Sequence, residues 1–280
     1  MHDIALGAIP STKDKRDIEF TPVTIGGEPK IITNISMLCS DHQHKVGKCT
    51  SYLKSIIEFL YYKQTGVYVE LSEDFLYIVL KNYIDKNWIE GSSLRSAIQT
   101  AMKYGVCREA VFPSDASLTH EQLLARPIPQ VAWNDALNQR IGGYMNIPID
   151  PSLIKLAIKR FGMLYAMVEI GDKWWTPSWH KDDILPLKKS YPIVGGHAIC
   201  IYGYQEVNGK LRIYFKNSWG PGWADNGNAY FDYEDYKPYL RECFGITLES
   251  LMHMVDNSPK VEESVWRGLL DLFRKINIIK

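Results

Sequence analysis

The sequence predicts an α+β protein in which a helical lobe is followed by a lobe built on a twisted antiparallel sheet. Three helix-like stretches lie between residues 49 and 104. Beyond residue 160 the chain changes to runs rich in β-branched and aromatic residues, such as M-L-Y-A-M-V-E-I and L-R-I-Y-F-K-N. A chain of 280 residues with 46% hydrophobic content can bury such a core without disulfides or metal ions.

The first predicted helix covers residues 49–65, where apolar residues recur at helical spacing and Gly66 provides a stop signal. Two further helices are predicted over 72–86 and 92–104, and each is opened by a serine that can cap the first turn. Cys49 therefore stands at the start of a helix.

We divide the chain into an extended N-terminal segment (1–34), a helical lobe (35–135), a β-rich lobe (136–256) and a C-terminal amphipathic helix (257–280), all within one domain. Prolines and paired glycines break any periodicity in the first segment. The last segment has an apolar stripe opposite its charges. We expect this helix to pack on its own domain, with a protein partner or a membrane surface as the alternative.

Composition excludes several classes of function. Lys+Arg and Asp+Glu are equal in number, so no net field favours nucleic acid or an anionic membrane. The five cysteines are odd in number and form no C-x-x-C pair, which argues against a disulfide scaffold and a zinc site. We see no secretory signal and no membrane span, and expect a cytoplasmic protein unless a leader was trimmed or release is non-classical. We expect no metal and no cofactor.

A cysteine at a helix start is a candidate nucleophile, because the helix N-terminus and a nearby cationic histidine both lower a thiol pKa. Alone, such a cysteine is more often a small buried hydrophobe. Cys49 needs a histidine from elsewhere. His197 is the best candidate, because it opens a predicted strand in V-G-G-H-A-I-C-I-Y-G-Y, where two glycines leave its surroundings open.

The turn after that strand decides whether His197 and Asn217 can cooperate. A two-residue Asn208-Gly209 loop would put the two side chains on opposite faces of the hairpin. A three-residue loop that also includes Val207 places His197 opposite Trp219 and makes Asn217 its diagonal neighbour on the same face. We predict the three-residue loop.

The stretches Q-H-K-V-G-K-C, G-H-A-I and K-N-S-W-G-P-G-W-A-D-N-G together resemble papain-like cysteine peptidases, from about residue 35 to residue 235. In that family the histidine and asparagine follow the cysteine by about 130 to 150 residues. His197 follows Cys49 by 148 residues, and Asn217, at 168, is somewhat late. The resemblance implies the two-lobe papain-like fold, with the cysteine on a central helix and the active site between the lobes.

By this resemblance Cys49 is the nucleophile of a cysteine endopeptidase and His197 is its general base and later its acid. Asn217 orients the imidazole. The side-chain amide of Gln43 completes an oxyanion hole with the backbone N–H of Cys49. The implied substrate is a peptide or protein, whose peptide bond is cleaved through a thioester.

The resemblance also implies a substrate pocket. The stretch I-E-G-S-S-L-R aligns with the segment that binds extended substrate backbone in the family, so Gly91 and Ser92 are candidate backbone contacts. Leu94 and Ala198 would border the pocket for the side chain two residues before the scissile bond. We also place Trp219 among the substrate-binding residues. In the predicted hairpin register it covers the contact between the histidine and the asparagine and keeps water from it.

The chain departs from animal and plant members next to the cysteine. Thr50 stands where they carry Trp, and Val46 where they carry a disulfide-forming Cys, so G-K-C-T-S is nearer to the microbial form. The stretch before Cys49 is too short for a long propeptide. We therefore hypothesise that residues 1–30 lie over the cleft and restrain activity.

Other interpretations stay open. The same triad serves an acyltransferase, a transpeptidase or an amidase, and a non-catalytic module could keep the cleft as a peptide groove. Trp175, Trp179 and His180 could form a ligand platform, although a packed loop is the simpler expectation. His42 and His44 lack a suitably spaced third metal ligand, so we expect them to be solvent-facing cleft residues.

Overall fold

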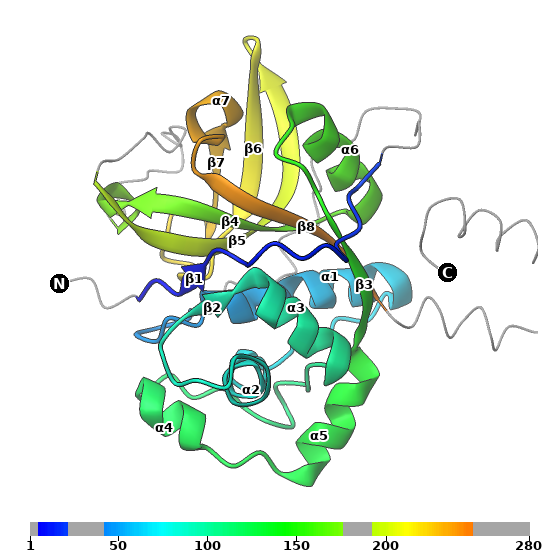
Figure 1. Ribbon diagram of the computed structural model, residues 1–280, viewed down its shortest axis with the longest axis vertical. Helices are drawn as coiled ribbons and strands as arrows, with labels where there is room; N and C mark the ends of the chain where they lie inside the picture. Colours follow the sequence, from blue (N-terminus) through cyan, green and yellow to red (C-terminus); the bar gives the residue numbers. More distant parts are fainter. Residues whose placement is uncertain (1–4, 22–41, 176–191, 249–280) are drawn as a thin grey trace, which may run out of the picture.

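The computed structural model describes residues 5–21, 42–175 and 192–248, which form a helical lobe packed against a sheet lobe (Figure 1). The predicted α+β architecture is confirmed. The α-helices are α1 (Leu53–Thr65), α2 (Glu73–Val79), α3 (Leu94–Lys103), α4 (His120–Ala125), α5 (Gln130–Ala136), α6 (Pro151–Phe161) and α7 (Tyr233–Tyr236). The strands are β1 (Ala8–Ile9), β2 (Ser92–Ser93), β3 (Ile141–Asn146), β4 (Leu164–Gly171), β5 (Ile193–Val207), β6 (Lys210–Lys216), β7 (Asn228–Asp232) and β8 (Leu240–Leu248).

The three helices predicted from the sequence begin and end with the expected signals. The first opens as a 3₁₀ turn, Cys49–Tyr52, continues as α1, and stops at Gly66 with φ 72°. The hydroxyls of Ser72 and Ser93 cap α2 and α3 by accepting backbone N–H groups. The chain continues beyond α2 as a π-helical segment, Leu80–Asp85.

The main sheet has six strands in the order β3-β8-β4-β5-β6-β7, and each pair of neighbours is antiparallel. Alternation along β4 divides the core into two layers. Tyr165 and Met167 join the cluster shared with α1 and α3, whereas Leu164 and Ala166 join the cluster that α6 covers. The sheet is therefore buried on both faces, with the helical lobe on one of them.

The predicted three-residue hairpin loop is wrong. β5 and β6 are joined by the two-residue turn Asn208-Gly209, in which both residues have positive φ, as a type I′ turn requires. A bulge at Tyr202 then shifts the register, so that Cys200 pairs with Lys216. Towards the site the strands thus have the register that we predicted, although a bulge produces it and not the loop.

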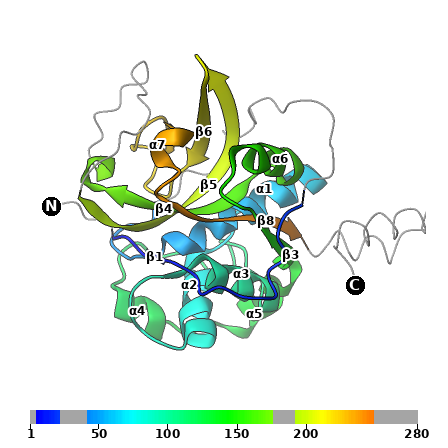
Figure 2. The same ribbon diagram turned by 45° about the horizontal axis from the view of Figure 1, so that its top comes forward.

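Residues 5–11, which we call the N-terminal strap, run between the two lobes in both views (Figures 1 and 2). Within the strap, β1 pairs in parallel with β2, with Ala8 opposite Ser92. Further along, Asp17 accepts a hydrogen bond of 2.7 Å from the Tyr144 hydroxyl and pairs with Arg95. The strap is therefore held on its C-terminal side by contacts to α3 and β3.

The predicted C-terminal helix at 257–280 lies outside the described residues, as do Trp179 and His180. Within residues 5–21, 42–175 and 192–248, no helix combines the length and the apolar character that crossing a membrane requires.

Two glycines that follow helices provide a matched test of the packing. Gly66 and Gly105 both have positive φ, but a Cβ at Gly66 would meet no atom within 4 Å, whereas one at Gly105 would stand 1.8 Å from the carbonyl oxygen of Ala136. We expect Gly66→Ala to lower the free energy of unfolding by about 1 kcal/mol from backbone strain alone. Gly105→Ala should lower it by about 2–4 kcal/mol, because the α5 backbone must also move.

Urea unfolding of both variants, followed by circular dichroism, measures the difference. Equal losses in the two variants would show that the close approach of α5 to the end of α3 is not required.

Candidate active site

Cys49 lies at the first turn of the helix that leads into α1, where the sequence predicted it. The side chain is fully buried between the lobes. Burial raises the pKa of the thiol to about 11, although the backbone N–H groups of Ala198 and Gly7 are close enough to favour the thiolate. Cys49 therefore adjoins both β5 and the strap, and near pH 7 it is a neutral thiol.

His197 and Asn217 are brought together as predicted, since Nε2 of the imidazole lies 2.6 Å from Oδ1 of the amide. The same amide oxygen accepts the backbone N–H of Ser218 at 2.8 Å, which fixes its orientation. Nδ1 of His197 has no hydrogen-bond partner among the described residues. Burial lowers the pKa of His197 to about 4, so the ring is neutral and Nδ1 can accept a proton.

The indole of Trp219 covers this contact, with its ring centre 4.8 Å from that of His197. Trp219 itself stacks on Trp175, with ring centres 4.8 Å apart and planes 9° from parallel. Trp175 thus packs against the site's aromatic cover. The buried Trp174, which the sequence analysis did not single out, touches both His197 and Trp219 edge-on.

Gln43 is fixed by a residue that the sequence analysis missed. Its Oε1 accepts a hydrogen bond of 2.6 Å from the hydroxyl of Ser218, so the amide nitrogen must point the other way. Nε2 then donates to the carbonyl oxygen of Ala5 at 2.6 Å and to that of Val46 at 3.3 Å. The amide nitrogen thus already holds a peptide carbonyl oxygen from the strap.

The backbone groups of Gly91 and Ser92 form hydrogen bonds in different directions. Gly91 directs its N–H to the Tyr77 hydroxyl at 3.1 Å and its carbonyl to the Lys81 ammonium at 2.8 Å, both within the helical lobe. Ser92 donates its N–H to the carbonyl of Gly7 at 2.6 Å. Of these two backbone N–H groups, that of Ser92 is the one that bonds to an extended peptide, here the strap.

Leu94 and Ala198 are both buried and belong to one hydrophobic cluster that also contains Ala8 of the strap. The two predicted pocket residues thus come from opposite lobes, α3 and β5 respectively.

The strap lies against Gln43, Cys49 and Ser92 of the site. It contacts Gln43 through Ala5, Cys49 and Ser92 through Gly7, and Glu242 through the backbone N–H and hydroxyl of Ser11. Gly47, Gly195 and Gly196 pack so closely against the strap that they leave no space for a side chain. A Cβ at any of them would lie within 3 Å of an atom of Leu6 or Ala8. Gly7 presents its backbone N–H to the Cys49 sulfur.

His42 and His44 border the site as a stacked, half-buried pair whose ring centres are 4.5 Å apart. The backbone N–H of His44 donates to Nδ1 of His42 at 2.8 Å. Burial lowers the pKa of both rings. In the part of the chain that the structure describes, no group of three His, Cys, Asp or Glu side chains could hold a metal ion.

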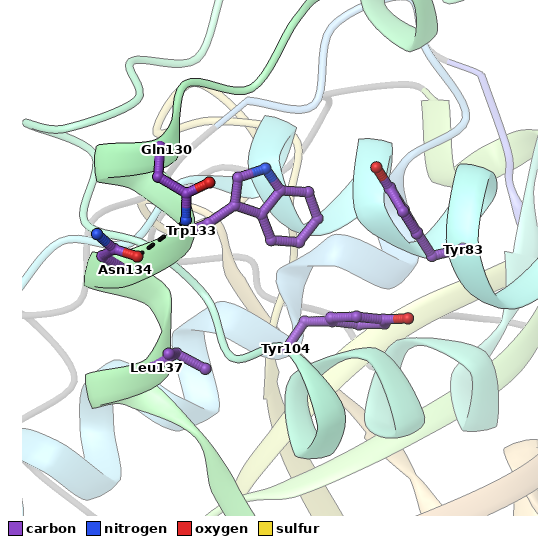
Figure 3. Close-up of a pocket in the computed structure, with 6 residues that line it drawn as sticks. All are labelled: Tyr83, Tyr104, Gln130, Trp133, Asn134 and Leu137. Atoms are coloured by element: carbon purple, nitrogen blue, oxygen red, sulfur yellow. Dashed lines mark hydrogen bonds between the residues drawn. The ribbon is translucent and has the colours of Figure 1, made fainter.

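A separate hollow of about 400 Å³ lies on the helical lobe (Figure 3). It is lined by Tyr83, Tyr104, Gln130, Trp133, Asn134 and Leu137. The three aromatic rings pack against one another with centres 5.3 to 5.9 Å apart, and Gln130 donates to Asn134 across one turn of α5. None of the predicted site residues lines this hollow.

Comparison with known proteins identifies the family. The model of the papain family cysteine proteases matches residues 42–247. An uncharacterized peptidase C1-like protein of Acanthamoeba polyphaga mimivirus is 29% identical over 258 residues, which are 79% of each chain. Chymopapain of Carica papaya is 27% identical over 163 residues, 58% of this chain and 42% of that protein.

Among solved structures, the crystal structure of xylellain, a cysteine protease from Xylella fastidiosa, superposes with a TM-score of 0.74 at 22% identity, covering 88% of this chain and 97% of that one. Digestive procathepsin L 3 of Tenebrio molitor gives a TM-score of 0.64 at 17% identity, covering 88% of this chain and 77% of that one. These likenesses show the papain-like fold. With the family match over most of its length, the chain belongs to the papain family of cysteine proteases.

Proposed function

We propose that this cysteine peptidase hydrolyses peptide bonds with Cys49, His197 and Asn217 as its triad and Gln43 in its oxyanion hole. The observation that carries the proposal is the 2.6 Å contact between His197 Nε2 and Asn217 Oδ1. It leaves Nδ1 as the free nitrogen of a ring on β5, the strand whose Ala198 amide also approaches the Cys49 thiol.

In the proposed reaction His197 Nδ1 takes the thiol proton as Cys49 Sγ bonds to the carbonyl carbon of the substrate. The negative oxygen that forms is held by Gln43 Nε2 and the Cys49 N–H. His197 then gives its proton to the departing amine as the C–N bond breaks. Water, deprotonated by the same imidazole, attacks the thioester, releases the acid and restores the thiol.

The strap supports a further part of the proposal, namely how activity is restrained. Its Ala5 carbonyl binds the Gln43 amide that the oxyanion would need, and its Gly7 carbonyl binds the Ser92 amide that a substrate would need. We propose that the strap must leave before a peptide can bind. Its departure readmits water to Cys49 and His197, which lowers the thiol pKa and raises the imidazole pKa.

Substitution of Gln43 tests the oxyanion role. We expect Gln43→Ala to lower kcat for a peptide amide by about 10²–10³-fold, because one of the two oxyanion donors is lost. The alkylation rate of Cys49 by iodoacetamide should not fall, since that reaction forms no oxyanion and loss of the Ala5 contact loosens the strap over the thiol. Cys49→Ala should abolish both signals. A variant at Gln43 with undiminished kcat would contradict the assignment.

Substitution of Gly7 tests the strap. A Cβ at this position would stand 1.7 Å from the carbonyl oxygen of Gly47, so Gly7→Ala cannot keep the strap in place. We expect turnover of an added peptide to rise. The pH midpoint of Cys49 alkylation should fall from near the buried value of about 11, because the thiol regains contact with water.

Gly222→Ala provides the control, since a Cβ there meets no atom within 4 Å. If the alkylation profiles of Gly7→Ala and the wild-type chain coincided, the strap would not be what keeps the thiol protonated.

A further inference from the structure

We propose that Lys48 is a positioning residue for the reaction, because its buried ammonium fixes the peptide plane that carries the Cys49 N–H. This inference rests on the proposed function, since that N–H is one of the two oxyanion donors. Lys48 does not touch the reacting atoms. Its effect on them passes through the backbone of the turn that precedes the nucleophile.

The backbone at Lys48 joins two tight turns. Its N–H donates to the carbonyl of Val46 at 2.7 Å, and its carbonyl accepts the N–H of Ser51 at 2.8 Å. Its φ of −97° and ψ of 23° fall in the sparsely populated bridge region between helix and strand. Because ψ of Lys48 sets the plane of the next peptide, this one torsion aims the Cys49 N–H.

The side chain is anchored inside the helical lobe. The Lys48 ammonium forms an ion pair with the fully buried carboxylate of Asp74 and lies 3.6 Å from that of Glu73, both in the first turn of α2. Asp74 is itself fixed, because its other oxygen accepts the backbone N–H of Asp115 at 2.8 Å. The anchor therefore ties the turn to α2 through a carboxylate that cannot rotate freely.

The charge of the Lys48 ammonium restricts where its side chain can lie. A buried ammonium is stable only where carboxylates meet it, so Lys48 cannot adopt other rotamers without leaving a charge unpaired. Burial alone would raise the pKa of Glu73, but Lys54 and Lys48 outweigh burial and lower it. Glu73 therefore stays ionised and attracts the lysine. An apolar side chain would fill the same space without restricting ψ in this way.

Lys54 offers a matched control in the same cluster. It is equally buried and approaches Glu73 at 3.3 Å and the carbonyl of Leu71 at 2.8 Å. However, it lies within α1, where helical hydrogen bonds already set the backbone. Removing its charge disturbs the same carboxylates without freeing the peptide before Cys49.

The test compares Lys48→Met with Lys54→Met in the full chain carrying Gly7→Ala, which displaces the strap. It uses steady-state turnover of a peptide amide, iodoacetamide alkylation and thermal unfolding. Lys48→Met should lower kcat by about 100-fold, with KM and the alkylation rate nearly unchanged, because the donor is misaimed while the thiol stays in place. Lys54→Met should be destabilised to a similar extent but keep its kcat. Lys48→Arg should recover part of kcat.

The double variant Lys48→Met/Asp74→Asn removes both charges and separates positioning from stability. We expect it to regain thermal stability and to keep the low kcat. Recovery of kcat together with stability, or an equal loss of kcat in Lys54→Met, would overturn the positioning role. A Gly7→Ala chain, with its strap displaced, that shows no turnover sensitive to Cys49→Ala would instead overturn the proposed function, and with it this role.

Discussion

The site depends on the exclusion of water from Cys49 and His197. Burial raises the pKa of the thiol and lowers that of the imidazole, so both groups are neutral in this state. A thiolate–imidazolium pair requires a more polar environment or a nearby compensating dipole. A segment that covers these two side chains therefore also sets their pKa values. Here that segment is a strap from the same chain, whose backbone carbonyls accept hydrogen bonds from Gln43 Nε2 and the Ser92 N–H.

The two lobes hold the site by different means. On the sheet side, aromatic rings and the Ser218 hydroxyl set the orientations of His197 and Gln43. On the helical side, buried lysines hold the backbone, since Lys48 pairs with Asp74 directly before Cys49 and Lys81 donates to the carbonyl of Gly91. Charged anchors resist rotation because any displacement leaves a buried charge without a partner. The segments at Lys48 and Gly91 are thus both held by contacts within the helical lobe.

Features that depend on residues close together in the sequence could be predicted, and features that depend on distant residues could not. The helices at 49–65, 72–86 and 92–104 were predictable, because their caps and stop signals lie within a few residues. Strand β8 was not, because it pairs with β3 and β4, far away along the chain. The positions of the site residues followed from motifs. The contact between Ser11 and Glu242 spans 231 residues and has no local signal.

For the β5–β6 hairpin the predicted turn was wrong, yet the predicted register near the site was correct. Local chemistry favoured the two-residue Asn208-Gly209 turn, and the structure has it. Cooperation between His197 and Asn217 required the other register, and the structure also has that near the site. The bulge at Tyr202 reconciles the two, since one extra residue moves every later side chain to the opposite face. The turn at one end of a hairpin and the residue pairing needed at the other end can therefore both be satisfied. The condition is that one strand between them contains a bulge with one extra residue.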